Sequence, residues 1–218
     1  LDPDNSVLHE VGPEPLPGTV KVEHIFPMRS LDKGTTDQDI VHFVTQSTFG
    51  VKQYLAQPKL DGSALSLEYV AGNLHRAATR GSGERGEDVT LNAKLIANIP
   101  LRLKIPADCH IRGEVVMPLA VFEEKYRTVS PNPRNLCSGA LRQKHGEGKA
   151  DAADLVFCAY DVKFVNESPI ADNDSELLSW LQKAGIEPAP WTIFKSDTPQ
   201  AEMIEHTKRW SEKRSDFD

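Results

Sequence analysis

The chain has 218 residues, 39% of them hydrophobic and 26% charged, and its formal net charge is −7 at pH 7. A chain of this size and composition can bury a proper core and is typical of soluble globular proteins. The acidic balance excludes a basic nucleic-acid-binding face over the whole domain, and no apolar run is long enough to span a bilayer. We therefore expect a monomer with no membrane association.

Residues 1–34 are rich in proline and glycine and poorly periodic, so we expect an extended lead-in that packs on a domain covering residues 35–218. The chain opens with Leu1 rather than methionine, and we expect it to be cut from a larger protein. Residues 35–46 predict a helix, with threonine and aspartate as N-cap candidates.

The hydrophobic period changes to two after residue 51. The alternating run at 64–70, a tight turn at Gly72-Asn73 and the returning run at 74–80 predict an antiparallel hairpin. Residues 90–99 then predict a helix capped by Thr90.

Residues 110–117 predict a strand that stops at Pro118, and the stretch after it is helical. The apolar run at 155–165 is typical of a buried strand.

Two amphipathic helices finish the chain, the first at 175–185, with Ser175 as its cap and Gly185 at its end, the second at 198–213. Hairpins mixed with helices indicate an α+β fold with mostly antiparallel sheets.

Three widely spaced cysteines, Cys109, Cys137 and Cys158, include no C-x-x-C pair. This spacing argues against a disulfide framework and against a zinc site, and it fits a reducing compartment. We therefore expect a cytoplasmic protein. The histidines show no metal-ligand spacing, and we assign no metal ligand.

Two short motifs have both a structural and a chemical interpretation. The stretch "PKLDGS" at 58–63 is either a surface turn or a site in which Lys59 is a nucleophile. The stretch "GSGERG" at 81–86 matches a dinucleotide-binding pattern, but it follows the second arm of a hairpin rather than a strand of a parallel βαβ unit. A flexible polar loop is the better interpretation, with a loop that brings Arg80 and Arg85 to phosphates as the alternative.

Three further positions remain open on the residues alone. Glu114, inside "RGEVVM", either faces solvent or fixes a ribose hydroxyl or a magnesium ion. In "SPNPRNLCSGALRQK" a helix is expected to start near Asn135, with Arg134 at its N-terminus and Arg142 two turns later. Two such arginines suit phosphate recognition but also an ordinary salt-bridge pair. Tyr160 is more often a core residue in such a strand.

Taken together, these motifs resemble those of bacterial NAD-dependent DNA ligases. The stretches "VEHIFPMRSLDK", "KLDG", "HRAATRGSGERGEDVTLN", "RGEVVM", "NPRNLCSGALRQ" and "LVFCAY" occur in the order found in that family and extend over essentially the whole chain. The chain is similar to the adenylation domain of such ligases. The resemblance implies the nucleotidyltransferase fold of DNA ligases and mRNA capping enzymes.

The resemblance also implies a chemistry. Lys59 would attack the α-phosphorus of NAD to form lysyl-AMP, AMP would pass to the 5′-phosphate of a DNA nick, and the 3′-hydroxyl would then seal the strand. NAD is the implied AMP donor, Mg²⁺ the implied metal and nicked double-stranded DNA the implied partner. Zinc would belong to a domain outside this chain.

The resemblance assigns two sets of site residues. The catalytic set is Lys59, Asp61, Arg80, Glu114 and Arg142, and the nucleotide-binding set is Ser30, Leu31, Gln57, Leu60, Gly62, Arg134 and Tyr160. Within these sets Ser30, Leu31 and Leu60 would line the adenosine pocket, and Tyr160 would abut the adenine. Glu114 would hold the ribose, and Gln57 would read the adenine amino group. Asp61 would orient the lysine or bind metal, and the arginines would neutralise phosphate charge.

The sequence departs from the family pattern at Gln57, where the family has glutamate, and also at Ser82 and Arg29. The family's nicotinamide-binding subdomain would precede Leu1, and the strand with its second catalytic lysine would follow Asp218. We therefore expect the isolated chain not to self-adenylate with NAD.

Three alternatives stay open: an ATP-dependent nucleotidyltransferase, a catalytically silent nucleotide-binding or DNA-scaffolding module, and a dinucleotide-dependent oxidoreductase. The predicted hairpin counts against the last of these.

Overall fold

The computed structural model describes residues 20–30, 32–46, 50–144, 148–165 and 173–212. Leu31 and residues 1–19 of the expected lead-in lie outside the described residues. Within the described part, no helix has the length and apolar character needed to cross a membrane.

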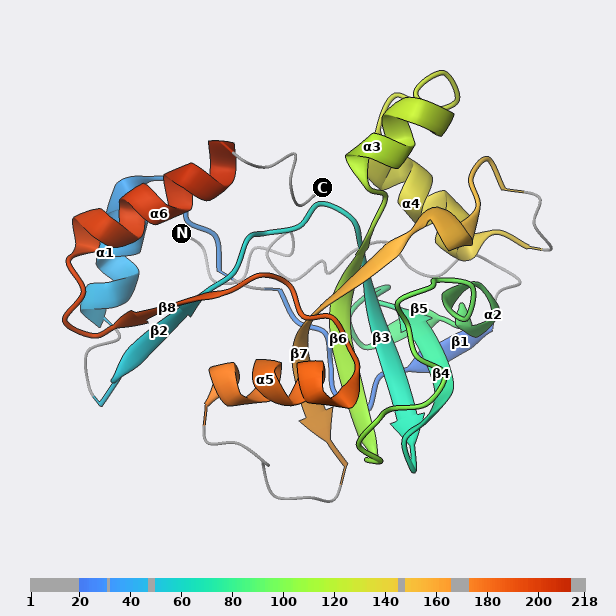
Figure 1. Ribbon diagram of the computed structural model, residues 1–218, viewed down its shortest axis with the longest axis horizontal. Coiled ribbons are helices and arrows are strands. Elements are labelled where there is room, and N and C mark those ends of the chain that lie inside the picture. Colours follow the sequence, from blue (N-terminus) through green and yellow to red (C-terminus); the bar gives the residue numbers. More distant parts are fainter. Residues whose placement is uncertain (1–19, 31, 47–49, 145–147, 166–172, 213–218) are drawn as a thin grey trace.

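A four-stranded antiparallel sheet forms the centre of the molecule, in the order β4-β3-β6-β7 (Figure 1). Its strands are β3 (Ser63–Val70), β4 (Asn73–Thr79), β6 (Cys109–Val116) and β7 (Val156–Phe164). Sheets and helices are mixed and every strand ladder is antiparallel, so the α+β prediction is confirmed.

One face of this sheet is apolar and covered by helices. Side chains alternate between faces along a strand, so Leu65, Leu67 and Tyr69 of β3 share this face and are almost fully buried. Helices α2 (Thr90–Ala93), α4 (Pro133–Arg142) and α5 (Asp174–Ala184) contribute buried residues to the same core. Between β6 and α4 the chain forms α3 (Leu119–Val121) and a π-helical turn (Phe122–Tyr126).

The opposite face of the sheet is polar. The strand register places Ser66 beside Arg112, Glu68 beside His110, and Glu114 between Ala64 and Cys158. A short sheet of β1 (Lys21–Glu23) and β5 (Arg85–Glu87) lies next to the main sheet.

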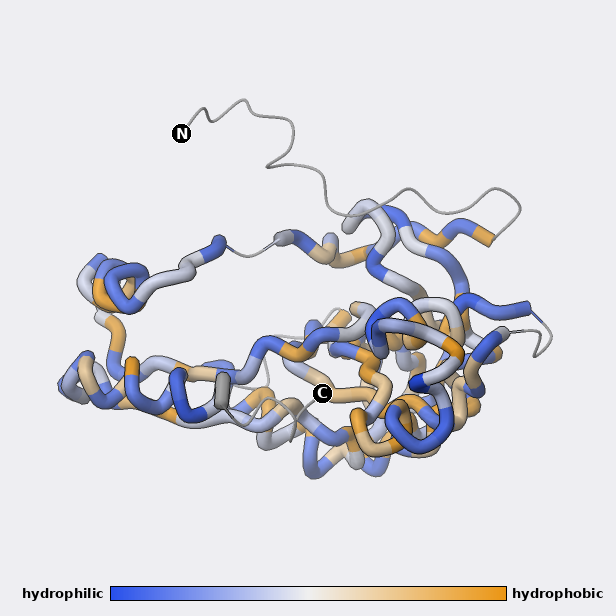
Figure 2. The backbone as a smooth tube through the Cα atoms, turned by 90° about the horizontal axis from the view of Figure 1, so that it is seen from above, coloured by the Kyte–Doolittle hydropathy of each residue, from blue (hydrophilic) through white to orange (hydrophobic). Residues whose placement is uncertain are grey.

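A smaller lobe lies to one side of the body (Figure 1). It contains α1 (Asp37–Gln46), α6 (Gln200–Glu212) and the antiparallel pair β2 (Gln53–Ala56) and β8 (Thr192–Lys195). Its own core consists of Val44, Phe194 and Met203. Figure 2 shows that the segment before α1 and the β2–β8 pair reach this lobe along separate paths.

The predicted elements near the chain ends are largely confirmed. The helix expected at 35–46 is α1, in which Asp39 accepts hydrogen bonds from the backbone N–H and hydroxyl of Thr36. The two C-terminal helices also form. The cap of α5 is Asn173 rather than Ser175, because the Asn173 side chain accepts the N–H of Glu176, whereas Gly185 ends the helix in the left-handed conformation as expected.

The hairpin is confirmed, but its turn lies one residue earlier than predicted. Ala71 and Gly72 form the two-residue loop with positive φ angles of 47° and 76°. The helix predicted at 90–99 was wrong in length, since only Thr90–Ala93 is helical, and the Thr90 side chain does not cap it. Its hydroxyl instead donates to Asp88 and accepts the N–H of Ala77.

The run at 155–165 forms a strand, but it is not buried throughout. A bulge between the pairs Gly113–Ala159 and Arg112–Asp161 leaves Tyr160 as an extra residue on β7. Phe157 and Ala159 before the bulge face the core, as does Val162 after it. Tyr160 is 37% exposed, so the interpretation as a core residue was wrong.

Candidate active site

Lys59 lies on the connection between β2 and β3, and its side chain is exposed. The neighbouring Leu60 is buried and packs with Val116 and Ala189. Gly62 lies against β6 so closely that a Cβ atom there would be 1.9 Å from the Val115 carbonyl oxygen. Because no side chain fits at that distance, Gly62 fixes the turn that follows the lysine.

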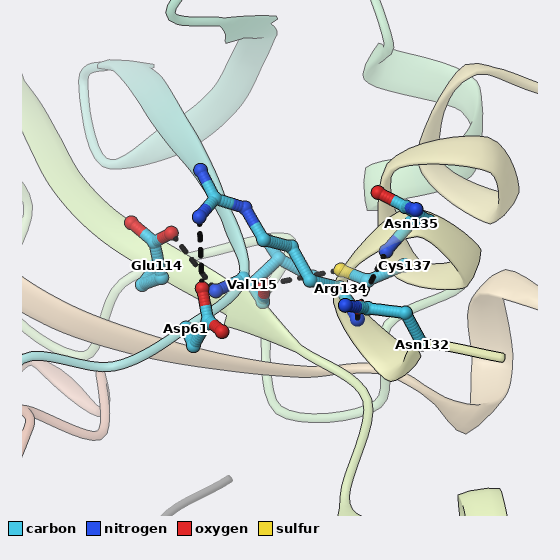
Figure 3. Close-up of polar contacts among 8 residues, drawn as sticks. Asp61, Glu114, Val115, Asn132, Arg134, Asn135 and Cys137 are labelled. Carbon is cyan, nitrogen blue, oxygen red and sulfur yellow. Dashed lines mark hydrogen bonds and ion pairs between the residues drawn. The ribbon is translucent and has the colours of Figure 1, made fainter.

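The carboxylates nearest this turn are held by specific partners. Asp61 accepts a hydrogen bond from Arg134 at 2.9 Å, and Glu114 accepts the backbone N–H of Gly62 at 3.2 Å (Figure 3). The Asp61–Arg134 pair is partly exposed, so it orients the two groups more than it stabilises the fold.

Arg134 is positioned by the start of α4. Asn132 is the N-cap of this helix and accepts the N–H groups of Arg134 and Asn135, and Pro133 occupies the first helical position (Figure 3). The helix thus begins two residues before the predicted start. The positive N-terminal end of α4 and the guanidinium both face the turn that carries Lys59, which favours an anion there.

Glu114 shares an electrostatic environment with these groups. Burial raises the pKa of its carboxyl, and the Gly62 N–H and the charges of Lys59 and Arg134 oppose this rise. A half-buried carboxylate close to a lysine, an arginine and the Asp61 carboxylate is the arrangement expected of a functional site rather than of a solvent-facing strand residue.

Cys137 belongs to the support of this site and was not identified from the sequence. Its thiol donates to the Val115 carbonyl oxygen at 3.0 Å and thereby ties α4 to β6 (Figure 3). Burial raises the pKa of this thiol to about 12, so it stays protonated and able to donate.

Arg80, Ser30 and Tyr160 form a second part of the candidate site. The Arg80 guanidinium donates to the Met28 carbonyl oxygen and to the Ser30 hydroxyl, both at 3.0 Å. Burial of part of the ring raises the pKa of Tyr160 to about 12, and the Glu114 carboxylate adds to the rise while Arg80 opposes it. The charges of Glu114 and Arg80 therefore both act on the Tyr160 hydroxyl.

Two further predicted site residues have surroundings of a different kind. Arg142, in the last turn of α4, pairs through its Nε with the buried Glu87 of β5 at 2.8 Å. Gln57 is half-buried, and its Nε2 atom is buried with no hydrogen-bond partner in the described part of the chain.

The stretch at 81–86 is a tight turn followed by β5. Ser82 donates its N–H to Arg85, Gly83 donates to Arg80, and the Arg85 N–H is accepted by the Ser82 hydroxyl. These N–H groups are therefore committed within the turn, and Arg85 pairs with Glu23 at 3.1 Å. The stretch is thus a hydrogen-bonded polar turn, and these three amides are not free to form a phosphate cradle.

Mg²⁺ is compatible with the residues present. Within the described ranges, no group of three or more His, Cys, Asp or Glu side chains is placed to hold a metal ion. Magnesium sites next to phosphates commonly use only one or two carboxylates, together with substrate oxygens and water. Asp61 and Glu114 supply that number.

The sequence is similar to curated bacterial DNA ligases. A DNA ligase of Rhodopseudomonas palustris is 40% identical over 198 residues, which cover 84% of this chain and 28% of that protein. A DNA ligase of Natranaerobius thermophilus is 38% identical over 97% of this chain and 33% of its own length. The chain thus spans about a third or less of these relatives.

The family described as "NAD-dependent DNA ligase adenylation domain" matches residues 18–218. The chain belongs to this family, as the resemblance of its motifs implied.

Similar solved structures include the chain named Pmar-Lig_PreS3, with a TM-score of 0.48 and 16% identity over 81% of this chain and 38% of its own. Another is an RNA ligase of Naegleria gruberi, with a TM-score of 0.43 and 11% identity over 91% of this chain and 51% of its own.

Proposed function

We propose that Lys59 is the nucleophile that accepts AMP from NAD in the first step of DNA ligation. The supporting observation is its position: an exposed lysine on a turn fixed by Leu60 and Gly62, next to the Asp61–Arg134 pair and Glu114. A nucleophile on a rigid, positively flanked turn suits attack on a phosphorus atom.

The proposed step can be written with all bonds and protons. The lysine ammonium loses a proton, and the neutral amine forms a bond to the α-phosphorus of NAD. The bond from this phosphorus to the bridging oxygen breaks, and nicotinamide mononucleotide leaves with the electron pair. A second proton leaves the nitrogen, which gives the lysyl-AMP phosphoramidate. Mg²⁺, when bound, would offset phosphate charge in this step.

The surrounding residues receive roles that match their contacts. Asp61 orients the lysine or takes part in metal binding, and Arg134 turns from Asp61 towards the phosphate when the nucleotide enters. Arg80 reaches phosphate oxygens from its anchor at Ser30. Glu114 accepts a ribose hydroxyl, and the exposed Tyr160 lies against the adenine.

Gln57 is the proposed contact to the adenine edge. Its buried Nε2 has no hydrogen-bond partner among the described residues, which is costly unless a ligand supplies an acceptor. The amide can also accept from the adenine amino group through its oxygen, without the charge that a glutamate would add. Nicked double-stranded DNA is the proposed partner, and parts of the full-length protein outside this nucleotide site would bind it.

The test is nick sealing by the natural full-length gene product with NAD and Mg²⁺. We expect Lys59→Ala to abolish sealing and to remove the adenylyl mass from the protein in mass spectrometry. The matched control is Lys52→Ala, an exposed lysine just before β2, which should seal at the wild-type rate.

Two results would contradict the proposal. Sealing by Lys59→Ala would show a catalytically silent module, and sealing with ATP but not with NAD would show an ATP-dependent enzyme.

A further inference from the structure

Two histidines lie together on the polar face of the main sheet, next to the end of β4 that leads to Arg80. His24 follows β1 and His110 belongs to β6, and they face one another across a small hollow. The hollow is lined by Val22, Glu23, His24, Ser66, Glu68, Arg76, Ala78 and His110. Both rings are thus enclosed between the sheet and the segment at 20–30.

His24 fastens this segment to the end of β4. Its ring Nε2 hydrogen-bonds the Thr79 carbonyl oxygen at 3.0 Å, and its backbone N–H donates to the Glu84 carbonyl at 2.8 Å. The backbone of Gly86 packs closely against both groups, since a Cβ on Gly86 would lie 3.0 Å from the His24 Nε2 and 1.8 Å from the Thr79 oxygen. Because a carbonyl oxygen can only accept, the ring Nε2 acts as the N–H donor to the buried Thr79.

His110 supports the same segment from the sheet side. Its ring is 7% exposed and meets the edge of the Phe26 ring at a centroid distance of 5.4 Å. Arg112, two residues along β6, donates to the Phe26 carbonyl oxygen at 2.7 Å. The segment is thus held at His24 and at Phe26, in addition to the pairing of β1 with β5.

The C-terminal part of the segment at 20–30 carries the two acceptors of Arg80. The Met28 carbonyl and the Ser30 hydroxyl each lie 3.0 Å from the Arg80 guanidinium. Met28 is itself buried and donates its N–H to Gly83. Because both acceptors belong to one docked segment, its release would deprive Arg80 of both contacts together.

We propose that His24, with His110 beside it, forms a pH-sensitive anchor for the segment at 20–30 and is thereby a positioning residue for Arg80. The anchor is inferred from the contacts above, and only the nucleotide as the ligand of Arg80 rests on the proposed function.

Burial and the charges around the two rings shift their pKa values, and these shifts determine how docking of the segment depends on pH. Glu68 pairs with Arg76 at 2.7 Å, Arg112 with Asp161 at 3.4 Å, and Glu23 with Arg85 at the exposed rim. Burial lowers the pKa of both histidines, and the charges of Arg76 and Arg112 lower it further. The Thr79 contact opposes this for His24, and Glu68 opposes it for His110.

A released segment would expose His24 with an ordinary pKa of about 6.5. The docked ring has a lower pKa, so the released state binds more protons below this value. Docking is therefore fully stabilised above about pH 6.5 and weakens as the pH falls below it.

The direct test is an NMR titration of the ¹⁵N-labelled chain that follows the Arg80 Nε–H and the histidine rings. We expect the Arg80 Nε–H signal to weaken between pH 7.5 and pH 5.5 as His24 takes up a proton, because one histidine with a released pKa of about 6.5 can weaken docking by at most about tenfold over this range. Exchange of arginine N–H with water is base-catalysed, so an unrelated arginine signal would sharpen over the same range.

Two variants make the test specific. His24→Gln keeps an N–H donor that does not titrate, so the Arg80 signal should persist to pH 5.5, whereas His24→Ala should lose it at both pH values. His75→Gln changes an exposed histidine on β4 and should titrate like the wild type. A wild-type signal of undiminished intensity at pH 5.5, or a His24→Gln variant with the same pH dependence as the wild type, would overturn the proposal.

AMP binding gives the functional readout. The wild type should bind AMP about tenfold more weakly at pH 5.5 than at pH 7.5, the scale of one lost charged hydrogen bond, and His24→Gln should lose less than twofold. Equal pH dependence of AMP binding in both proteins would contradict the link to the nucleotide. If the chain bound no AMP at both pH values, the result would count against the proposed function. The NMR titration would still show whether His24 anchors the segment at 20–30.

Discussion

Glu87 is a carboxylate with 2% exposure on β5, and the guanidinium of Arg142 is its partner at 2.8 Å. The resemblance placed Arg142 among the catalytic residues, and that role remains an untested prediction. Its contact gives it a structural task, because a buried carboxylate without a cation nearby is strongly disfavoured.

Replacing Glu87 with glutamine should destabilise the fold by about 2–3 kcal/mol, since it leaves a half-buried guanidinium without its counter-charge. Urea unfolding of the isolated chain measures this change. Glu84→Gln, at an exposed position in the turn before β5, should change stability by less than about 0.5 kcal/mol. Equal losses for the two variants would contradict the structural role of the pair.

The sequence motifs identified the residues that carry charge at the candidate site. Lys59, Asp61, Glu114 and Arg134 come together in the structure. Their supports could not be identified in the same way: the Val115 carbonyl is a backbone atom, and Cys137 has no distinguishing pattern around it. Such contacts depend on how α4 packs on β6, which no local spacing encodes.

At the level of single elements, the β3–β4 hairpin carries the one described non-glycine residue with positive φ, Ala71. Its N–H donates to the Asp108 carboxylate at 2.5 Å, which holds the turn against the body. The next residue, Gly72, has a φ of 76° and lies where a Cβ would approach the Pro106 Cα at 2.8 Å.

Two substitutions in this turn should have opposite effects. Ala71→Asn should stabilise the chain by about 0.5 kcal/mol, because asparagine tolerates the left-handed conformation that alanine adopts there. Gly72→Ala should destabilise it by about 1–3 kcal/mol through strain and the clash with Pro106. Thermal unfolding would show the two midpoints on opposite sides of the wild type, and midpoints on the same side would refute the assignment of the turn.

The elements that sequence patterns missed are those set by tertiary hydrogen bonds. The helix expected at 90–99 ends early where Asn92 donates to the carbonyls of Leu141 and Gln143 and Asn98 pairs with the backbone of Phe157. These contacts outweigh a weak local helix preference. The bulge at Tyr160 likewise interrupts an alternation that looked like one apolar run.

At the scale of the whole molecule, the main core and the core of the small lobe differ greatly in size among the described residues. The main core extends over the large sheet and three helices, whereas the small lobe buries only Val44, Phe194 and Met203. Apolar burial is the main source of stability, so local opening should begin in the lobe.

Hydrogen exchange followed by mass spectrometry should therefore show faster exchange in β2 and β8 than in β3 and β6. Met203→Ala should accelerate exchange in α1, α6 and the β2–β8 pair and leave the central strands unchanged. Uniform exchange across both sheets would contradict the division into two cores.

The position of Lys59 between these two bodies has a mechanical consequence. Leu60 and Gly62 hold the chain against the main sheet, while β2, which ends just before Gln57, pairs with β8 of the lobe. A rotation of the lobe relative to the sheet would therefore act on Gln57, Pro58 and Lys59, and the fixed φ of proline leaves few bonds free to absorb it. Rotation of the lobe would therefore move the Lys59 amine relative to the groups held on the main sheet.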